Sequence, residues 1–484
     1  MRPDFSGYTY HGTDRFERLL TFDVHEHDHS NEFSIKELLS SHGIGPNITF
    51  AARRIRHVTD AKHRSQNTEI DKPLFPHGFR NTTIGNLPSG RFLKPLKVHL
   101  TQSARPHEIN ASSLMFGTST TPERFNDKTK SPLKHWVRWL TDGHGKSNGA
   151  RMILALHTAE DEVLERISKI LKNLGIDGVV LRSKSTLDMP GRYMDLIRML
   201  WEDPTRAQRG YFGIADDDTF FPAIDELQKA LSRYDPKKPY YLGTFTERHD
   251  WLTKNLLPMA YGGASIFLTA PTMEKLVAAD CLAKNAKGRY ILNSTEGDRL
   301  LYLCLHNKTE IALTPLHRLW QFDMVGDPSG FYESGHQPLS LHHFKSWHHF
   351  TPEQAHVVAS ACGENCVFQK FQFNDNFVIS NGYSVAEYPR GIDFDPLQYE
   401  GTFDYGDVSK DLEDVIYVEA MGMLRKKLSG TGRKRQWILL GAKEMAEGTV
   451  VQVYVKRRND ERWIEKGVEK LPDRDSVIVL EWVS

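Results

Sequence analysis

Between about residues 111 and 243 the sequence alternates short apolar runs with amphipathic stretches, and this alternation constrains the fold more than any other feature. Apolar runs rich in β-forming residues indicate buried strands, whereas apolar residues three and four positions apart indicate helices. The chain offers strands at 113–117, 151–157, 177–182 and 211–215, and helices at 132–140, 160–174 and 191–201. Strands that alternate with helices pair in parallel, because each connection crosses over one face of the sheet. We therefore predict an α/β domain with a Rossmann-like, mostly parallel sheet and helices on both faces.

Three consecutive carboxylates, Asp216, Asp217 and Asp218, follow the last of these strands. Adjacent acids repel one another unless a cation lies among them, and hard divalent ions such as Mg²⁺ and Mn²⁺ prefer carboxylate oxygen. Ligand sites of α/β sheets lie where such strands end. The pattern therefore favours a metal-assisted diphosphate site over its alternative, a solvated acidic turn. A calcium-binding EF-hand loop does not fit, because the glycine and the distal glutamate that it requires would fall at Phe221 and Leu227.

Three further groups follow in the sequence. Gly262 and Gly263 allow the backbone to approach a bulky ligand closely, or they form a turn before the next strand. Asp298 begins an expected helix, where a carboxylate is either functional or a cap of the helix. His342 and His343 lie in an expected extended segment, where neighbouring side chains point to opposite faces. At most one of these histidines is therefore expected to reach a metal ion bound by the acids.

Taken together and in this order, these segments resemble the Fringe-like β1,3-glycosyltransferases. The resemblance covers about residues 112–350 and rests on five motifs: FGTST at 116–120, ADDDT at 215–219, YGGA at 261–264, GDRLLYLCL at 297–305 and SLHHF at 340–344. The segment NGYSV at 381–385 resembles the plant and fungal Fringe-related branch. Each motif alone is weakly specific, but five of them in this order are a specific signal.

The resemblance implies a GT-A type fold that uses Mn²⁺ and transfers a sugar from a nucleotide diphosphate with inversion at the anomeric carbon. The expected reaction moves a hexose or N-acetylhexosamine from a UDP-sugar to a hydroxyl of a glycan or glycoprotein, in β1,3 linkage. Two alternatives remain open: a non-catalytic GT-A-like protein that binds a sugar or a partner, and a metal-dependent phosphohydrolase that acts on nucleotide sugars. The sequence does not reveal which sugar or acceptor is used.

The same resemblance assigns roles to residues at the metal and the nucleotide. Asp218 and His343 would bind the metal directly. Asp216 and Asp217 would lie near the ribose and the water shell of the metal, and Asp216 would also take part in binding the metal. Thr118, near the end of the first strand, would lie close to the base of the nucleotide.

The remaining assignments concern the sugar and the acceptor. Gly262 and Gly263 would lie along the donor, and Asp298 matches the position of the general base. The family often has an acidic pair before this helix, where the present chain has Gly297 and Asp298. An inverting transfer needs one such carboxylate, on the face of the sugar opposite the leaving group, to accept the proton of the attacking hydroxyl.

Composition excludes some partners and indicates a compartment. The 484 residues include 62 basic and 62 acidic ones, so no net charge attracts nucleic acid or an anionic membrane. No apolar run approaches the ~20 residues of a membrane span, and the polar first residues are not those of a signal peptide. Five Asn-x-Ser/Thr sequons indicate the secretory pathway: Asn47, Asn81, Asn110, Asn293 and Asn307. We therefore expect a protein of the Golgi lumen whose type II membrane anchor lies outside this sequence.

The sequence predicts three regions. Residues 1–110 are polar and weakly periodic, as in a stem, residues 111–351 would form the GT-A domain, and residues 352–484 would form a small, mainly β lobe. Strands are expected in this lobe at 371–379, 437–440, 449–455 and 476–482. Four cysteines are too few for a disulfide scaffold: Cys281, Cys304, Cys362 and Cys366. The close pair at 362 and 366 lacks the second pair that zinc requires, so a local disulfide and two buried thiols remain as alternatives.

Overall fold

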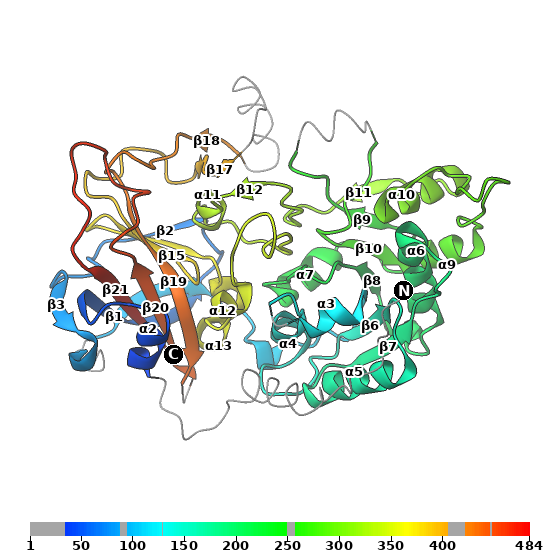
Figure 1. Cartoon of the computed structure of the whole chain (residues 1–484), viewed down its shortest axis with the longest axis horizontal. Helices are drawn as coiled ribbons and strands as arrows, with labels where there is room; N and C mark the ends of the chain where they lie inside the picture. Colours follow the sequence, from blue (N-terminus) through cyan, green and yellow to red (C-terminus); the bar gives the residue numbers. More distant parts are fainter. Residues whose placement is uncertain (1–33, 88–93, 128, 249–256, 405–421, 446–447) are drawn as a thin grey trace, which may run out of the picture.

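The computed structural model describes residues 34–87, 94–127, 129–248, 257–404, 422–445 and 448–484. Two bodies lie side by side in Figure 1: an α/β body drawn in cyan and green, and a β body that combines the blue end of the chain with its orange and red end. Within the described residues, the larger sheet of the first body has seven strands and that of the second body has ten. The predicted acids follow a strand of the seven-stranded sheet.

The seven-stranded sheet follows the predicted alternation of strands and helices. Its order is β11-β9-β10-β8-β5-β6-β7; β5, β6, β7 and β8 are parallel, whereas β10 runs against β8 and β9. The strands are β5 (Leu114–Thr120), β6 (Arg151–Leu156), β7 (Gly178–Arg182), β8 (Tyr211–Ile214), β9 (Tyr241–Gly243), β10 (Ile266–Thr269) and β11 (Leu313–Pro315). The prediction of an α/β domain with a mostly parallel sheet is therefore confirmed.

Helices cover both faces of this sheet. In β5, Leu114 and Phe116 pack into one core together with α4, α5 and α7, whereas Met115 packs into another with α6, α9 and α10. Successive side chains of a strand point to opposite faces, so a strand that is apolar throughout must be covered on both. The helices of this body are α3 (Pro122–Asn126), α4 (Leu133–Leu140), α5 (Asp161–Asn173), α6 (Met189–Glu202), α7 (Ile224–Leu231), α9 (Ala270–Ala278) and α10 (Gly297–Lys308).

The ten-stranded sheet joins strands from both ends of the chain. Its order is β2-β13-β14-β15-β19-β20-β21-β1-β3, with β4 beside β1. The N-terminal strands are β1 (Asn47–Ala61), β2 (Asn67–Ile70), β3 (Arg80–Thr83) and β4 (Leu96–Thr101). The C-terminal strands are β13 (Lys370–Phe373), β14 (Phe377–Ser380), β15 (Ser384–Glu387), β19 (Arg435–Glu444), β20 (Val450–Lys456) and β21 (Asp475–Val483). The mainly β region expected after residue 352 is present, and strands between residues 47 and 101 complete it.

The polar, stem-like region expected at residues 1–110 needs correction where the structure describes it. β1 is paired along most of its length with β21, and its Ile48 and Phe50 pack into a core with Val477 and Val479. The sequence conceals this strand, because the alternation of apolar residues is short and basic residues follow it, among them Arg53. Residues 1–33 of the expected stem lie outside the described part of the chain.

Smaller features complete the fold. The strand expected at 371–379 is a hairpin of β13 and β14, whose turn contains Asn376 at a φ of 62°, a conformation that asparagine adopts more readily than most residues. Disulfides join Cys362 to Cys366 and Cys281 to Cys304, so the close pair forms a local disulfide. Among the described residues, no helix is both long and apolar enough to cross a bilayer. The remaining elements include α2 (Ile35–Ser41), α11 (Ser329–Tyr332), α12 (Pro352–His356), α13 (Ala359–Cys362), β12 (Val325–Gly326), β16 (Tyr399–Glu400), β17 (Phe403–Asp404) and β18 (Leu424–Arg425).

Candidate metal centre and active site

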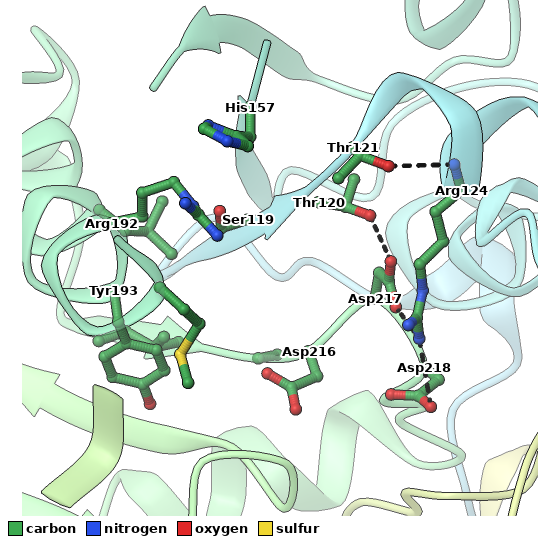
Figure 2. Close-up of a pocket in the computed structure, with 14 residues that line it drawn as sticks. Ser119, Thr120, Thr121, Arg124, His157, Arg192, Tyr193, Asp216, Asp217 and Asp218 are labelled. Atoms are coloured by element: carbon green, nitrogen blue, oxygen red, sulfur yellow. Dashed lines mark hydrogen bonds and ion pairs between the residues drawn. The ribbon is translucent and has the colours of Figure 1, made fainter. Parts of the chain in front are cut away.

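Two neighbouring cavities lie where the parallel strands end. The first, of about 270 Å³ (Figure 2), is lined at the ends of β5 and β6 and on α3 and α6 by Ser119, Thr120, Thr121, Arg124, His157 and Arg192, and also by the three acids. The second, of about 520 Å³, is lined by Glu296, Asp298, Gln321, Asp323, His342 and His343, among others. Met189, Tyr193 and Asp216 line both cavities. The predicted strand-end site therefore has two compartments, which meet at these three side chains.

The three acids face different neighbours. The buried carboxylate of Asp217 accepts a hydrogen bond from the Thr120 hydroxyl and lies 2.6 Å from the Arg124 guanidinium. Burial raises the pKa of Asp217, and the charge of Arg124 opposes this rise. Asp218 is also buried, whereas the Asp216 side chain is 49% exposed. The sequence suggested one cation among three repelling acids, but Arg124 already balances Asp217.

His342 faces the other two acids. Its Nε2 lies 3.2 Å from a carboxylate oxygen of Asp218 and 3.4 Å from one of Asp216, while its Nδ1 lies 2.9 Å from the backbone carbonyl oxygen of Gln321. Burial lowers the pKa of His342, but the charges of Asp218 and Asp216 outweigh burial and hold this pKa well above its ordinary value. Burial also opposes ionisation of Asp218, yet His342 keeps the pKa of that carboxyl below its ordinary value. Asp218 and His342 therefore each favour the charged form of the other.

His343 lies beside His342, so the expectation that the two side chains point to opposite faces is wrong. One ligand atom from each of Asp218, His342 and His343 lies within 4.8 Å of the others. The two imidazole rings are 3.6 Å apart, centre to centre. The reason is the backbone: His343 has a φ of 55°, in the left-handed region, so the segment is not extended at this residue and the two rings lie on the same side.

These residues fit a divalent metal ion. The Nε2 of His343 lies 3.1 Å from Asp323 Oδ1, and its Nδ1 is buried with no hydrogen-bond partner among the described residues. Asp323 is 1% exposed, and its other carboxylate oxygen accepts a hydrogen bond of 2.6 Å from Thr246. One ring nitrogen of each histidine is therefore hydrogen-bonded: Nδ1 of His342 to Gln321 and Nε2 of His343 to Asp323. Histidines that bind metals usually have such a hydrogen bond on their other nitrogen. One carboxylate and two imidazoles suit Mn²⁺ and other first-row transition metals.

Asp298 lies in the first turn of α10 and lines the second cavity. Its carboxylate accepts hydrogen bonds from the backbone N–H groups of Gly262, at 2.9 Å, and of Arg299, at 2.7 Å. Burial raises the pKa of Asp298 to about 6, and these two hydrogen bonds oppose the rise. The N-cap of α10 is Glu296, so Asp298 does not occupy the cap position. Its carboxyl group has the proton affinity of a base that works near neutral pH.

The predicted glycines make room for side chains. A Cβ atom on Gly263 would lie 2.1 Å from the His342 ring, and one on Gly262 would lie 2.9 Å from the Tyr193 hydroxyl oxygen.

Thr118, expected near the base of a nucleotide, is 1% exposed and donates a hydrogen bond of 3.0 Å to the carbonyl oxygen of Ala215. The three residues that follow it, at 119–121, line the first cavity.

Several residues of the site were not identified from the sequence. Arg124 comes from α3, Tyr193 from α6, and Asp323 from a segment between β11 and β12 that belongs to no helix or strand. None of them stands in a recognisable motif, because each reaches the site through tertiary packing. The adjacency of His342 and His343 was the one available signal for a pair of histidine ligands.

Comparison with known proteins yields weak structural similarities. No protein-family model and no curated protein sequence matches the chain. Similar solved structures include a nucleotide-diphospho-sugar transferase described as putative from Desulfovibrio desulfuricans (14% identity over 42% of this chain and 80% of that chain, TM-score 0.26). A mannosyltransferase from Pyrobaculum calidifontis, in complex with GDP-Man and Mn²⁺, shares 13% identity over 34% and 46% of the two chains (TM-score 0.25). A glycosyltransferase from Streptococcus pneumoniae shares 17% over 49% and 56% (TM-score 0.29). TM-scores this low carry no argument about the function of this chain.

Proposed function

We propose that this protein is a metal-dependent glycosyltransferase of the GT-A type that uses a nucleotide-diphosphate sugar as donor. The observation that carries the proposal is the meeting of Asp218, His342 and His343 at a strand end, beside a second cavity that contains the buried Asp298. The order of motifs that resembles the Fringe-like enzymes supports UDP-sugar as the donor and Mn²⁺ as the metal. The three candidate metal ligands alone, or the buried carboxyl of Asp298 alone, would not favour sugar transfer over simple binding.

Each of the two cavities would hold a different part of the reacting molecules. The first cavity would hold the nucleotide, with hydroxyl groups at residues 119–121 and the guanidinium of Arg192 as hydrogen-bond donors. Asp218, His342 and His343 would hold the ion, which when bound stabilises the charge that develops on the diphosphate leaving group. Arg124, paired with Asp217, would place its N–H donors beside the diphosphate leaving group.

Asp298 would act as the general base in the second cavity. The acceptor hydroxyl would lose its proton to the Asp298 carboxylate as its oxygen attacks the anomeric carbon. The bond from that carbon to the diphosphate oxygen then breaks on the opposite face of the sugar, so configuration is inverted. No covalent intermediate with the protein is required. We propose a hexose or N-acetylhexosamine as the transferred sugar and a glycan or glycoprotein hydroxyl as the acceptor, in β1,3 linkage.

We also propose the secretory pathway, with the Golgi lumen as the site of action and a type II anchor outside this sequence. All five sequon asparagines are exposed: Asn47, Asn81, Asn110, Asn293 and Asn307. Two disulfides are present among the described residues, and disulfides persist in oxidising compartments. Expression in a secretory host followed by removal of N-glycans tests this point: no change in mass on deglycosylation would contradict it.

A donor screen tests the enzymatic proposal. Purified protein is incubated with each of several UDP-sugars, with and without a panel of glycan acceptors, in Mn²⁺ or in excess EDTA, and released UDP is measured. The proposal expects release that requires both Mn²⁺ and an acceptor. Release of similar size without an acceptor would indicate a hydrolase. Saturable binding of UDP-sugar with no release would indicate a non-catalytic sugar-binding protein.

A further inference from the structure

Tyr193 of α6 lies between the two cavities. Its side chain lines the first cavity, with Ser119 and Asp217, and also the second, with Asp298. Figure 2 shows the Tyr193 ring projecting from α6. A nucleotide sugar bound as proposed would have its nucleotide in the first cavity and its anomeric carbon within reach of Asp298. The sugar must therefore lie where the cavities meet, which is the position of Tyr193.

The hydroxyl group of Tyr193 is buried and has no hydrogen-bond partner among the described residues. Buried tyrosine hydroxyls usually find a partner, because a buried donor without one costs free energy. Burial raises the pKa of the Tyr193 hydroxyl well above its ordinary value, and the charges of Asp298 and Asp216 add to the rise. The hydroxyl therefore stays protonated and can donate a hydrogen bond.

Two glycines of the site make room for the Tyr193 side chain. A Cβ atom on Gly297 would lie 2.5 Å from both Cβ and Cγ of Tyr193, and one on Gly262 would lie 2.9 Å from its hydroxyl oxygen. Gly297 precedes Asp298, and the N–H of Gly262 donates to the Asp298 carboxylate. The segments that position the proposed base are thus also shaped around this tyrosine. A side chain that is fixed so closely and yet has an unused donor is arranged for a ligand.

We propose that the Tyr193 hydroxyl donates a hydrogen bond to an oxygen of the sugar in the nucleotide-sugar donor, and so helps to determine which sugar is accepted. The inference rests on the proposed function. The contact is made to a hydroxyl or ring oxygen of a pyranose and not to the nucleotide. It selects sugars that present an acceptor oxygen at this point, because an analogue lacking that oxygen leaves the buried donor unpaired.

The test is Tyr193→Phe, which removes only the hydroxyl and keeps the ring against the two glycines. Binding of UDP, UDP-glucose, UDP-galactose, UDP-GlcNAc and UDP-GalNAc is measured by calorimetry in Mn²⁺ for the wild type and the variant. The affinity for UDP is expected to stay within about twofold, whereas the affinity for the preferred UDP-sugar falls about tenfold, the loss of one hydrogen bond that leaves its partner unpaired. The melting temperature of the free variant is expected not to fall, because no bond within the protein is lost.

Tyr211→Phe is the matched control. Tyr211 is buried at the opposite end of β8, and its hydroxyl donates to the backbone carbonyl oxygen of Tyr234 at 2.7 Å. This variant is expected to melt at a lower temperature and to bind both ligands as the wild type does. An equal loss of UDP and UDP-sugar affinity in Tyr193→Phe, or no loss of either, would overturn the inference, and so would a lower melting temperature without a change in binding. A wild type that binds neither ligand would instead contradict the proposed function.

Discussion

At the scale of single residues, the candidate site contains two of the buried polar atoms that have no partner among the described residues. The Nδ1 of His343 and the hydroxyl of Tyr193 both lack a hydrogen bond among the described residues. Most buried polar atoms are paired, and each unpaired one in a native structure needs an explanation. The proposed metal ion would pair with the first and the proposed sugar with the second. Thr118, by contrast, already has its partner in Ala215, which fits a role in joining β5 to β8.

Asp298 carries the sharpest prediction at this scale. Asp298→Asn keeps the shape of the side chain and removes its basicity, so nucleotide-sugar binding should survive while transfer falls ~10²–10⁴-fold. Because burial raises the pKa of Asp298 to about 6, the base form is lost as pH falls below that value. The kcat/KM of the wild type should therefore rise with pH up to about 6 and level off above it. A pH–rate profile in Mn²⁺ measures both effects. Unchanged turnover in the Asn variant would show that the base is another group.

Asp323 is predicted to act through His343. Asp323→Asn removes the charge that holds the imidazole by its Nε2, and losses of this kind weaken metal binding ~10–100-fold. Calorimetric titration of the apo-protein with Mn²⁺ measures the effect without an activity assay. Asp195→Asn is the matched control, since Asp195 is also a buried acid, paired with Arg198 on α6. Equal Mn²⁺ affinity in both variants would show that Asp323 does not contribute to metal binding through His343.

Prediction from sequence was uneven at this scale, for physical reasons. The acids and Asp298 stand at a strand end and a helix start, which the local pattern indicates, and the structure places both at the cavities. The two histidines were placed on opposite faces because nothing in the sequence reveals the positive φ of His343. Tyr193 becomes visible only when α6 packs against Gly262 and Gly297.

At the scale of elements, the site depends on how closely separate segments approach one another. The segment at 261–264, which precedes β10, passes so near the segment at 340–344 that only glycine fits at position 263. Gln321 links both segments to 321–323. Its side-chain oxygen accepts a hydrogen bond from the N–H of Ala264, and its backbone carbonyl oxygen accepts one from Nδ1 of His342. Three loops far apart in sequence thus position the histidines together.

Gly263→Ala tests this arrangement. Its Cβ would lie 2.1 Å from the His342 ring, so the imidazole must move and Mn²⁺ affinity should fall by at least about tenfold. Gly401→Ala is the control, because the nearest atom to its Cβ would be at an ordinary 3.5 Å. Titration with Mn²⁺ and thermal melting of both variants provide the measurement. Wild-type Mn²⁺ affinity in Gly263→Ala would mean that His342 does not bind the ion.

The elements themselves were largely predictable between residues 111 and 243. The predicted strand at 151–157 and helix at 191–201 are β6 and α6 to within two residues, because the alternation of apolar runs and amphipathic stretches is unbroken there. The sequence predicts one strand where the structure has the hairpin of β13 and β14, since its turn is only three residues long, with polar residues at 374–376. Local propensity does not separate a tight turn from a polar stretch within a strand.

At the scale of the whole molecule, the β body depends on strands from both ends of the chain. β1 lies inside the ten-stranded sheet, between β21 and the pair β3 and β4. Sequence reasoning missed this because pairing between strands some 430 residues apart leaves no local signal. A chain that begins at residue 111 would expose β21, a buried apolar strand, as a free edge.

Truncation tests this view of the molecule. A chain that begins at residue 111 should aggregate or lose its cooperative unfolding transition, whereas one that begins at residue 34 keeps every described element and should keep that transition. Size-exclusion chromatography and thermal melting distinguish these results. A monomeric, cooperatively folded chain starting at residue 111 would show that β1–β4 are an accessory to the β body.

The proposed function depends above all on Asp218, His342 and His343 holding a divalent metal together at a nucleotide-sugar site. Crystals grown with Mn²⁺ and UDP, with diffraction data collected at the manganese absorption edge, test it most directly. We predict one strong anomalous peak within coordination distance of an Asp218 oxygen and of one nitrogen of each histidine, with the UDP diphosphate bound to the same ion. Bound UDP with no anomalous peak at these three residues, or with its metal held elsewhere, would contradict the account.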